Sequence, residues 1–313
     1  MADDMTTRPT SGGGFERILA TTDFSPASRV AFETAMDFSR LFGAKLIVLH
    51  IFECVAQVPS PEGAQLIDMD GLLRNALNGL QSLKQEAEQR GITCETAIRG
   101  GVASVAIEEF AAAQQIDLTI MGTSALHGFE RLVFGSTAEA VLRKSPTPVL
   151  TVGPRVHCGA VSEQAQPVVF ATDFHATTIH AIRLAATVAE TTGSPLHCLH
   201  VLPRVLEAGG QASVIPAILS EALQHVASTS GIHVGEPICA TTYGSEVSNA
   251  VVEYAKQHNA KLIVLGIRQA SLASTHTPAH IAYRIITEAS CPVMTMAFES
   301  HTRHFSSLAA ACL

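Results

Sequence analysis

The chain has 313 residues, 47% of them hydrophobic and 15% charged, so it is long enough and apolar enough for two domains with buried cores. Its formal net charge is −8 and it has no stripe of Lys and Arg, which excludes a nucleic-acid backbone as the expected partner. No apolar run approaches the roughly 18 residues of a membrane span, and residues 1–14 lack the apolar core of a signal peptide, so we expect a cytoplasmic protein with no membrane contact.

Strands and helices alternate through the first half of the chain. Short apolar runs predict buried strands, and helical spacing of apolar residues predicts the helices between them. The expected strands are residues 16–20, 45–51, 93–98, 116–120 and 148–152, and the expected helices are 26–42, 71–90, 103–115 and 138–144. Strict alternation favours parallel βαβ units in a doubly wound sheet.

The second half repeats the first. The run Thr-Asp-Phe at 22–24 recurs at 172–174, and Leu-His at 49–50 recurs at 199–200. Further along, Pro-Val at 148–149 recurs at 292–293. Two copies of one domain are the simplest explanation. We expect domains at 15–154 and 166–299, a linker at 155–165, and tails at 1–14 and 300–313.

A loop at residues 121–137 carries the clearest chemistry of the first half. It contains Gly122 and Gly135, and Ser136 and Thr137 follow at the start of a helix. Glycine lets the backbone approach an anion closely, and the free N–H groups at a helix start favour negative charge. The pattern therefore indicates a phosphate site, although Gly-Ser-Thr before a helix is also typical of an ordinary N-cap.

The corresponding loop of the second half has lost this pattern. Gly266 remains, but residues 267–278 contain no glycine. Ala279 and His280 stand where the first half has Gly135 and Ser136. We interpret the second half as a degenerate domain kept for pairing, for stability or for another ligand.

Histidines and cysteines could suggest a metal site in the second half. His197, Cys198 and His200 lie in the predicted strand at 196–201, where His197 and Cys198 point to opposite faces. The seven cysteines include no Cys-x-x-Cys pair. We therefore interpret the cysteines as small hydrophobic residues and predict no metal site of protein ligands.

The chain resembles the universal stress protein family in its tandem two-domain form. The resemblance rests on Thr22-Asp23-Phe24-Ser25, on residues 48–51, on 121–136 and on 146–149, and it extends over about 15–299. The family's nucleotide motif is Gly-x2-Gly-x9-Gly-Ser/Thr. Here the spacing is intact, with Gly122, then Ala125 in place of the second glycine, then Gly135-Ser136.

Alanine at position 125 has a physical consequence. If the backbone there needs a positive φ, alanine costs about 1 kcal/mol or more, and its methyl group narrows the approach to the phosphates. Gly128 offers flexibility three residues later. The departure predicts weaker binding, or a preference for a nucleotide with fewer phosphates.

The resemblance implies a fold and an assembly. The fold is two repeated doubly wound α/β domains, each a five-stranded parallel sheet with helices on both faces, of the adenine nucleotide alpha hydrolase-like type. The apolar sheet edges at 149–152 and 293–296 are implied to meet within one chain as an intramolecular pseudo-dimer, and two chains to pair further as a homodimer.

The resemblance also implies a ligand, ATP or AMP, with Mg²⁺ held through its phosphates. Asp23 and its neighbours would lie at the end of the first strand, Ile51 would line an adenine pocket, and the glycine loop would hold ribose and phosphates. The implied nucleotide-binding residues are Thr22, Asp23, Ser25, Ile51, Met121, Gly122, Ala125, Gly128, Gly135, Ser136 and Thr137.

Three classes of function stay open. The first is a nucleotide-binding stress-response sensor, in which any ATP hydrolysis is slow. The second is a nucleotide-free interaction protein or scaffold with both sites vestigial. The third, an enzyme, is disfavoured: the first strand is followed by no His-x-x-His pair for nucleotidyl transfer, and residues 122–126 lack the second glycine of Gly-x-Ser-x-Gly.

Overall fold

The computed structural model describes residues 14–53, 68–123, 135–157, 166–173, 179–204, 207, 215–230, 236–268 and 279–298. Eight helices and ten strands of this part alternate along the chain. The first half contains β1 (Arg17–Thr22), α1 (Pro26–Phe42), β2 (Lys45–Phe52), α2 (Met69–Gln89), β3 (Cys94–Gly100), α3 (Ala103–Ala113), β4 (Leu118–Gly122), α4 (Ser136–Lys144) and β5 (Val149–Val152). The second contains β6 (Val168–Ala171), α5 (Ile179–Thr191), β7 (Leu196–Pro203), α6 (Ile215–Ser230), β8 (Ile238–Gly244), α7 (Val247–Gln257), β9 (Leu262–Arg268), α8 (Ala279–Glu288) and β10 (Val293–Phe298).

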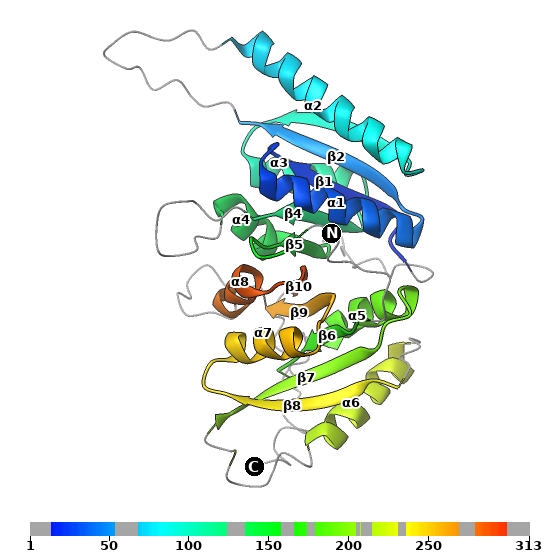
Figure 1. Cartoon of the computed structure of the whole chain (residues 1–313), viewed down its shortest axis with the longest axis vertical. Helices are drawn as coiled ribbons and strands as arrows, with labels where there is room; N and C mark the ends of the chain where they lie inside the picture. Colours follow the sequence, from blue (N-terminus) through cyan, green and yellow to red (C-terminus); the bar gives the residue numbers. More distant parts are fainter. Residues whose placement is uncertain are drawn as a thin grey trace, which may run out of the picture.

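All ten strands form one sheet in the order β3-β2-β1-β4-β5-β10-β9-β6-β7-β8 (Figure 1). Within each half the strands are parallel, and both halves have the same internal order. The halves join where β5 and β10 pair antiparallel, with Leu150 opposite Met294. The predicted α/β class with two repeated doubly wound units is therefore confirmed.

Helices cover both faces of the sheet because each buried strand carries apolar side chains on both sides. One core cluster holds Ile18 and Val48 with residues of α1, α2, α5 and α6. The other holds Leu19 and Leu49 with residues of α3, α4, α7 and α8. Each cluster contains residues of both halves, so the two cores are continuous across the β5–β10 junction.

The fourth strand begins two residues later than the apolar run predicts. Ile116 lies just after the end of α3 at Ala113, where its N–H donates a 2.9 Å hydrogen bond to the Ala111 carbonyl of that helix. The Asp117 carboxylate accepts hydrogen bonds of 2.9 Å from the N–H groups of Glu16 and Arg17 at the start of β1. Asp117 thereby aligns the starts of β1 and β4, which places their other ends together.

The predicted helix ends agree with local chemistry. The Ser25 hydroxyl accepts a 3.2 Å hydrogen bond from the Ser28 N–H at the start of α1, and Pro26 occupies the first turn. Gly43 closes α1 with a φ of 64°, as expected for a glycine C-cap.

Across the described residues we find no helix with both the length and the apolar character needed to cross a membrane.

Candidate functional site

The ends of β1, β2 and β4 and the start of α4 meet at one edge of the first half. β1 lies between β2 and β4, and the connections lead away from it in opposite directions: α1 and α2 cover one face, α3 and α4 the other. This is the topological switch point of a doubly wound sheet, and open α/β sheets in general bind ligands at such a point, beyond the carboxyl ends of the strands.

Thr22 and Ser25 hold the loop after β1 in place. The Thr22 hydroxyl is buried, lies 3.1 Å from the Ser28 hydroxyl and accepts a 3.0 Å hydrogen bond from the Phe24 N–H. Ser25 is the N-cap of α1. Both hydroxyls are therefore engaged in fixing the loop.

Asp23 presents an exposed carboxylate at the edge of the sheet. Burial alone would raise its pKa, but hydrogen bonds from Ser25 and Ser28 hold the pKa below its usual value. Its Oδ1 accepts a 3.0 Å hydrogen bond from the Ser25 N–H. The Asp23 side chain is therefore ionised at neutral pH, and the hydrogen bond within its own turn fixes its direction. Its carboxylate oxygens can accept hydrogen bonds from a ligand.

Phe24 has a strained backbone conformation that its residue type does not predict. It has a φ of 62°, which an aromatic residue rarely adopts. Its ring lies 4.8 Å from the His50 ring, and His50 Nδ1 donates a 2.8 Å hydrogen bond to the Thr22 carbonyl. Gly79 of α2 makes room for this ring, since a Cβ there would lie 2.6 Å from Phe24 Cε1.

Gly122 ends β4 against the first turn of α1. A Cβ at this position would overlap the Ala27 carbonyl and lie 2.9 Å from the Ser28 nitrogen. The fold itself therefore requires glycine here. Met121, the preceding residue, is buried in the core beneath α3 and α4, and Ile51 is half-buried against the same core.

Gly135 begins α4 in a different environment. It is the N-cap residue, with φ −62° and ψ 136°, and no side chain caps the helix there. A Cβ at Gly135 would meet no atom of the described residues within 4 Å. Ser136 is exposed and Thr137 half-exposed in the first turn. The start of α4 thus presents backbone donors and two hydroxyls beside space that none of the described residues fills.

Not every residue of the expected motif can be placed. Ala125 and Gly128 lie outside the described residues. The remaining nine are brought to this edge of the sheet by β1, β2, β4 and α4. The described residues contain no group of three or more His, Cys, Asp or Glu side chains suited to hold a metal ion.

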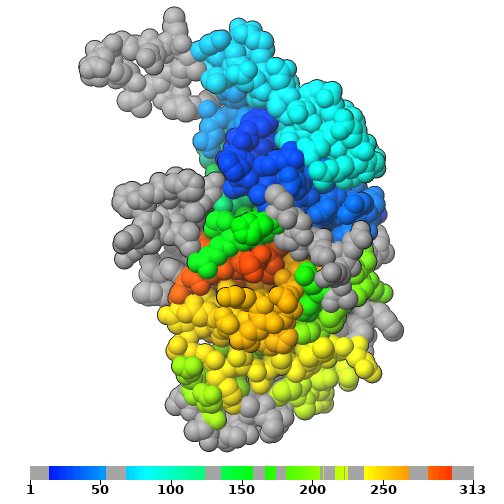
Figure 2. Space-filling view, in the orientation of Figure 1, coloured from blue at the N-terminus to red at the C-terminus, as the bar shows by residue number. Residues whose placement is uncertain are grey.

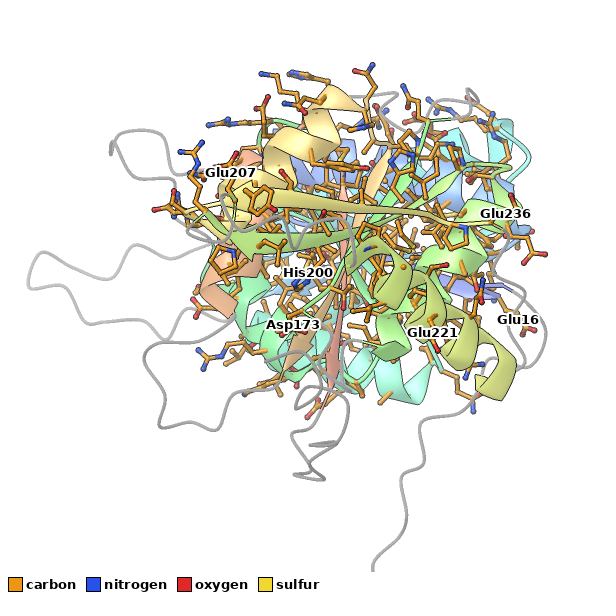
Figure 3. All side chains as sticks on the ribbon, turned by 90° about the horizontal axis from the view of Figure 1, so that it is seen from below. Glu16, Asp173, His200, Glu207, Glu221 and Glu236 are labelled. Carbon is orange, nitrogen blue, oxygen red and sulfur yellow. The ribbon has the colours of Figure 1, made fainter. Side chains whose placement is uncertain are left out.

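The second half repeats part of this arrangement. His200 Nδ1 lies 2.8 Å from the Thr172 carbonyl, as His50 does from that of Thr22, and Asp173 follows β6 (Figure 3). The His280 side chain lies outside the described part.

A shallow cavity of about 210 Å³ opens at the ends of β7 and β8, lined by Arg204, Tyr243, Gly244, Ser245, Glu246, Asn249 and Ala250.

Comparison with known proteins gives one consistent result. The family model described as "Universal stress protein family" matches residues 14–153 and 165–296. A universal stress protein of Methanocaldococcus jannaschii is 31% identical over 139 residues, which cover 44% of this chain and 82% of that protein. The crystal structure of a universal stress protein from Archaeoglobus fulgidus superimposes with a TM-score of 0.69 at 24% identity, covering 90% of this chain and 98% of that one.

Proposed function

Because the chain belongs to the universal stress protein family, we propose that it is a cytoplasmic stress-response protein whose first domain, residues 15–154, binds an adenine nucleotide. The ligand is ATP or AMP, and it lies at the edge of the sheet where β1, β2 and β4 end. The second domain, residues 166–299, serves as the pairing partner of the first. The protein acts as a sensor or regulator rather than a fast enzyme.

One observation carries this proposal: among the described residues, nothing fills the space at the start of α4. Gly135 has a φ of −62°, and a Cβ there would meet no atom of the described residues within 4 Å. Neither a positive φ nor packing against the described residues therefore calls for glycine there, which leaves its role as N-cap and the space for a ligand. A ligand that approaches the backbone donors of the first helical turn gives a reason for glycine, because a side chain would fill that space.

The residues at this edge fit the parts of an adenine nucleotide. The Asp23 carboxylate would accept hydrogen bonds from ribose hydroxyls, and Ile51 would contact the base. Ser136 and Thr137 would donate to phosphate oxygens from backbone and hydroxyl groups, supported by the helix dipole. Thr22, Ser25, Met121 and Gly122 would position these groups, and Mg²⁺ would arrive bound to the phosphates. Ala125 and Gly128 complete the proposed set.

Slow turnover follows from the state of Asp23. A general base works best when its pKa lies near the operating pH. Hydrogen bonds from Ser25 and Ser28 lower the pKa of Asp23, which makes its carboxylate a weak base towards water. The same bonds suit a carboxylate that orients a sugar.

A nucleotide-free interaction protein is the second candidate. The observation that favours it is the packing of Gly122 against Ala27, since the first glycine of the motif would persist without any ligand. Ala125 in place of the second glycine points the same way. Direct binding measurements separate the two candidates.

The test replaces Gly135 with serine and with valine and measures ATP, AMP and Mg-ATP binding by calorimetry. Serine is a better N-cap than glycine, so Gly135→Ser should hold or raise thermal stability. If a ligand occupies the space, both variants should bind nucleotide at least about tenfold more weakly, which corresponds to about 1.4 kcal/mol. Unchanged affinity in Gly135→Ser would leave Gly135 as an ordinary N-cap and contradict the proposed site.

A further inference from the structure

Two cysteines face each other in the second domain. Cys198 of β7 and Cys239 of β8 are direct partners in the parallel ladder, so their side chains leave the same face of the sheet. Neighbouring strands lie about 4.8 Å apart, inside the separation of roughly 4.4–6.8 Å between the Cα atoms of disulfide-bonded cysteines. Both residues are free thiols in the structure.

The surroundings make the two thiols unequal. Cys198 is fully buried in the core, while Cys239 is half-buried against it and lies on the edge strand of the sheet. A hydrogen bond with the Cys198 thiol, aided by one with the Ser220 hydroxyl of α6, lowers the pKa of Cys239. The Cys239 thiol and burial together raise the pKa of Cys198.

Other cysteines of the described part provide a contrast. Cys94 and Cys291 are buried, and burial raises the pKa of Cys94 to about 11 and that of Cys291 to about 12. In the first half the residue matching Cys198 is Val48, and its partner in β3 is Thr96. The paired thiols therefore belong to the second domain and are not inherited from the repeat.

We propose that Cys198 and Cys239 form a redox-active dithiol that hydrogen peroxide converts reversibly to a disulfide. The Cys239 thiolate attacks the peroxide: an S–O bond forms, the O–O bond breaks and, after proton uptake, water leaves. The Cys198 sulfur then attacks this sulfenic acid, so that the S–S bond forms, the S–O bond breaks and a second water leaves with the Cys198 proton. The two thiols lose two electrons and the peroxide gains them.

The position suggests what the disulfide would do. β8 is the outermost strand of the second half and lies at the far end of the molecule from α2 (Figure 2). A bond from β8 to the buried strand β7 would fasten this edge to the core beneath α6. This site is independent of the proposed nucleotide site, which lies in the other domain.

The test uses the full-length reduced protein, titrated with hydrogen peroxide at pH 7. Remaining thiols are blocked with N-ethylmaleimide under denaturing conditions, and unreduced peptides are identified by mass spectrometry. We expect a linked Cys198–Cys239 peptide that dithiothreitol releases, with Cys94 and Cys291 still alkylated. In the folded protein, Cys239 should react with N-ethylmaleimide at least about tenfold faster than Cys94.

Variants assign the two roles. Cys198→Ser should leave a Cys239 sulfenic acid that dimedone traps, whereas Cys239→Ser should leave Cys198 unoxidised. Cys291→Ser is the matched control and should form the disulfide like the wild type. Absence of the linked peptide from the wild type, or oxidation of Cys94 or Cys291 as fast as Cys239, would overturn the proposal.

Discussion

Gly122 and Gly135 belong to the same sequence motif, but glycine stands at the two positions for different physical reasons. Gly122 is needed because β4 packs directly on the first turn of α1, where a Cβ would overlap the Ala27 carbonyl. Gly135 has an ordinary negative φ, and a Cβ there would meet no described residue within 4 Å. Glycine at position 122 is therefore needed for the stability of the fold. We propose that glycine at position 135 leaves space for a ligand.

Alanine substitutions should separate these reasons. Gly122→Ala should lower the free energy of unfolding by about 1–3 kcal/mol, because backbone must move to admit the methyl group. Gly135→Ala is the matched control and should cost less than about 1 kcal/mol, the loss expected at an N-cap. Urea unfolding measures both, and equal losses would contradict the different environments of the two glycines.

The Asp23 carboxylate should contribute to stability in a pH-dependent way. Its pKa is lowered in the folded protein from an ordinary value of 3.8, so its contribution is present above that pH and is lost as the pH falls further through the folded-state pKa. Asp23→Asn keeps an oxygen acceptor for the Ser25 N–H but does not titrate.

The measurement is the difference in unfolding free energy between wild type and Asp23→Asn from pH 6 down to about pH 2. We expect the unfolding free energy of the wild type to exceed that of Asp23→Asn by a constant amount above about pH 5, and this difference to shrink in acid. An advantage that persists unchanged to the lowest pH would show that the hydrogen bonds of Asp23 do not favour its charged form.

At this scale the sequence predicts which residues gather but not why each is there. Thr22, Asp23 and Gly122 follow apolar strands, so their place at the sheet edge could be foreseen. The positive φ of Phe24 could not, because it depends on packing against His50 and Gly79 from distant segments. Nothing local to Phe24 signals that arrangement.

At the scale of elements, α2 packs against the loop after β1, and Gly79 is the residue of α2 that lies against the Phe24 ring. Glycine inside a helix normally costs about 1 kcal/mol relative to alanine, so Gly79→Ala would usually stabilise. Here the added Cβ would lie 2.6 Å from the Phe24 ring. We expect Gly79→Ala to be neutral or destabilising in the wild type.

A double-mutant cycle tests this coupling between α2 and the loop. In a Phe24→Ala background the ring is gone, so Gly79→Ala should become stabilising by about 0.5–1 kcal/mol. The control is Gly71→Ala at the start of the same helix, whose Cβ would meet the Asp68 side chain instead. Additive effects of the Phe24 and Gly79 changes would mean that the contact carries no energy.

The alternation of strands and helices is predictable because apolar runs and helix-ending glycines such as Gly43 are local signals. The start of β4 is not, because Asp117 caps the backbone of β1 about 100 residues away. The apolar residue next to it, Ile116, therefore looks like the start of a strand, but it lies in the turn after α3 and its N–H donates to the Ala111 carbonyl of that helix. Errors of this kind arise wherever a long-range hydrogen bond decides a boundary.

At the scale of the molecule, the repeat in the sequence predicts two similar halves, and the open apolar edges of β5 and β10 predict where they can meet. The structure pairs these edges antiparallel, with the Thr295 hydroxyl donating to the Val149 carbonyl at 3.3 Å. We propose that this intramolecular pairing is the functional assembly. Both core clusters run through the junction, so the halves should depend on each other.

Calorimetry tests that dependence. The wild type should unfold in one cooperative transition. Met294→Arg places an unpaired charge at a residue with 0% exposure and should cost several kcal/mol, separating the halves or unfolding both. Ile281→Arg, on the exposed side of α8 at 39% exposure, is the control and should change little. Two independent transitions in the wild type would contradict coupling through the junction.

The most direct test of the central proposal is the amount of nucleotide that the purified protein carries. Denaturant releases the ligand, and mass spectrometry identifies and quantifies it, in the wild type and in Gly135→Val. We predict about one ATP or AMP per chain, lost in the variant, since the second domain lacks the glycine pattern. Two nucleotides per chain would contradict the role given to the second domain, and none, with no binding of added Mg-ATP, would contradict the nucleotide site itself.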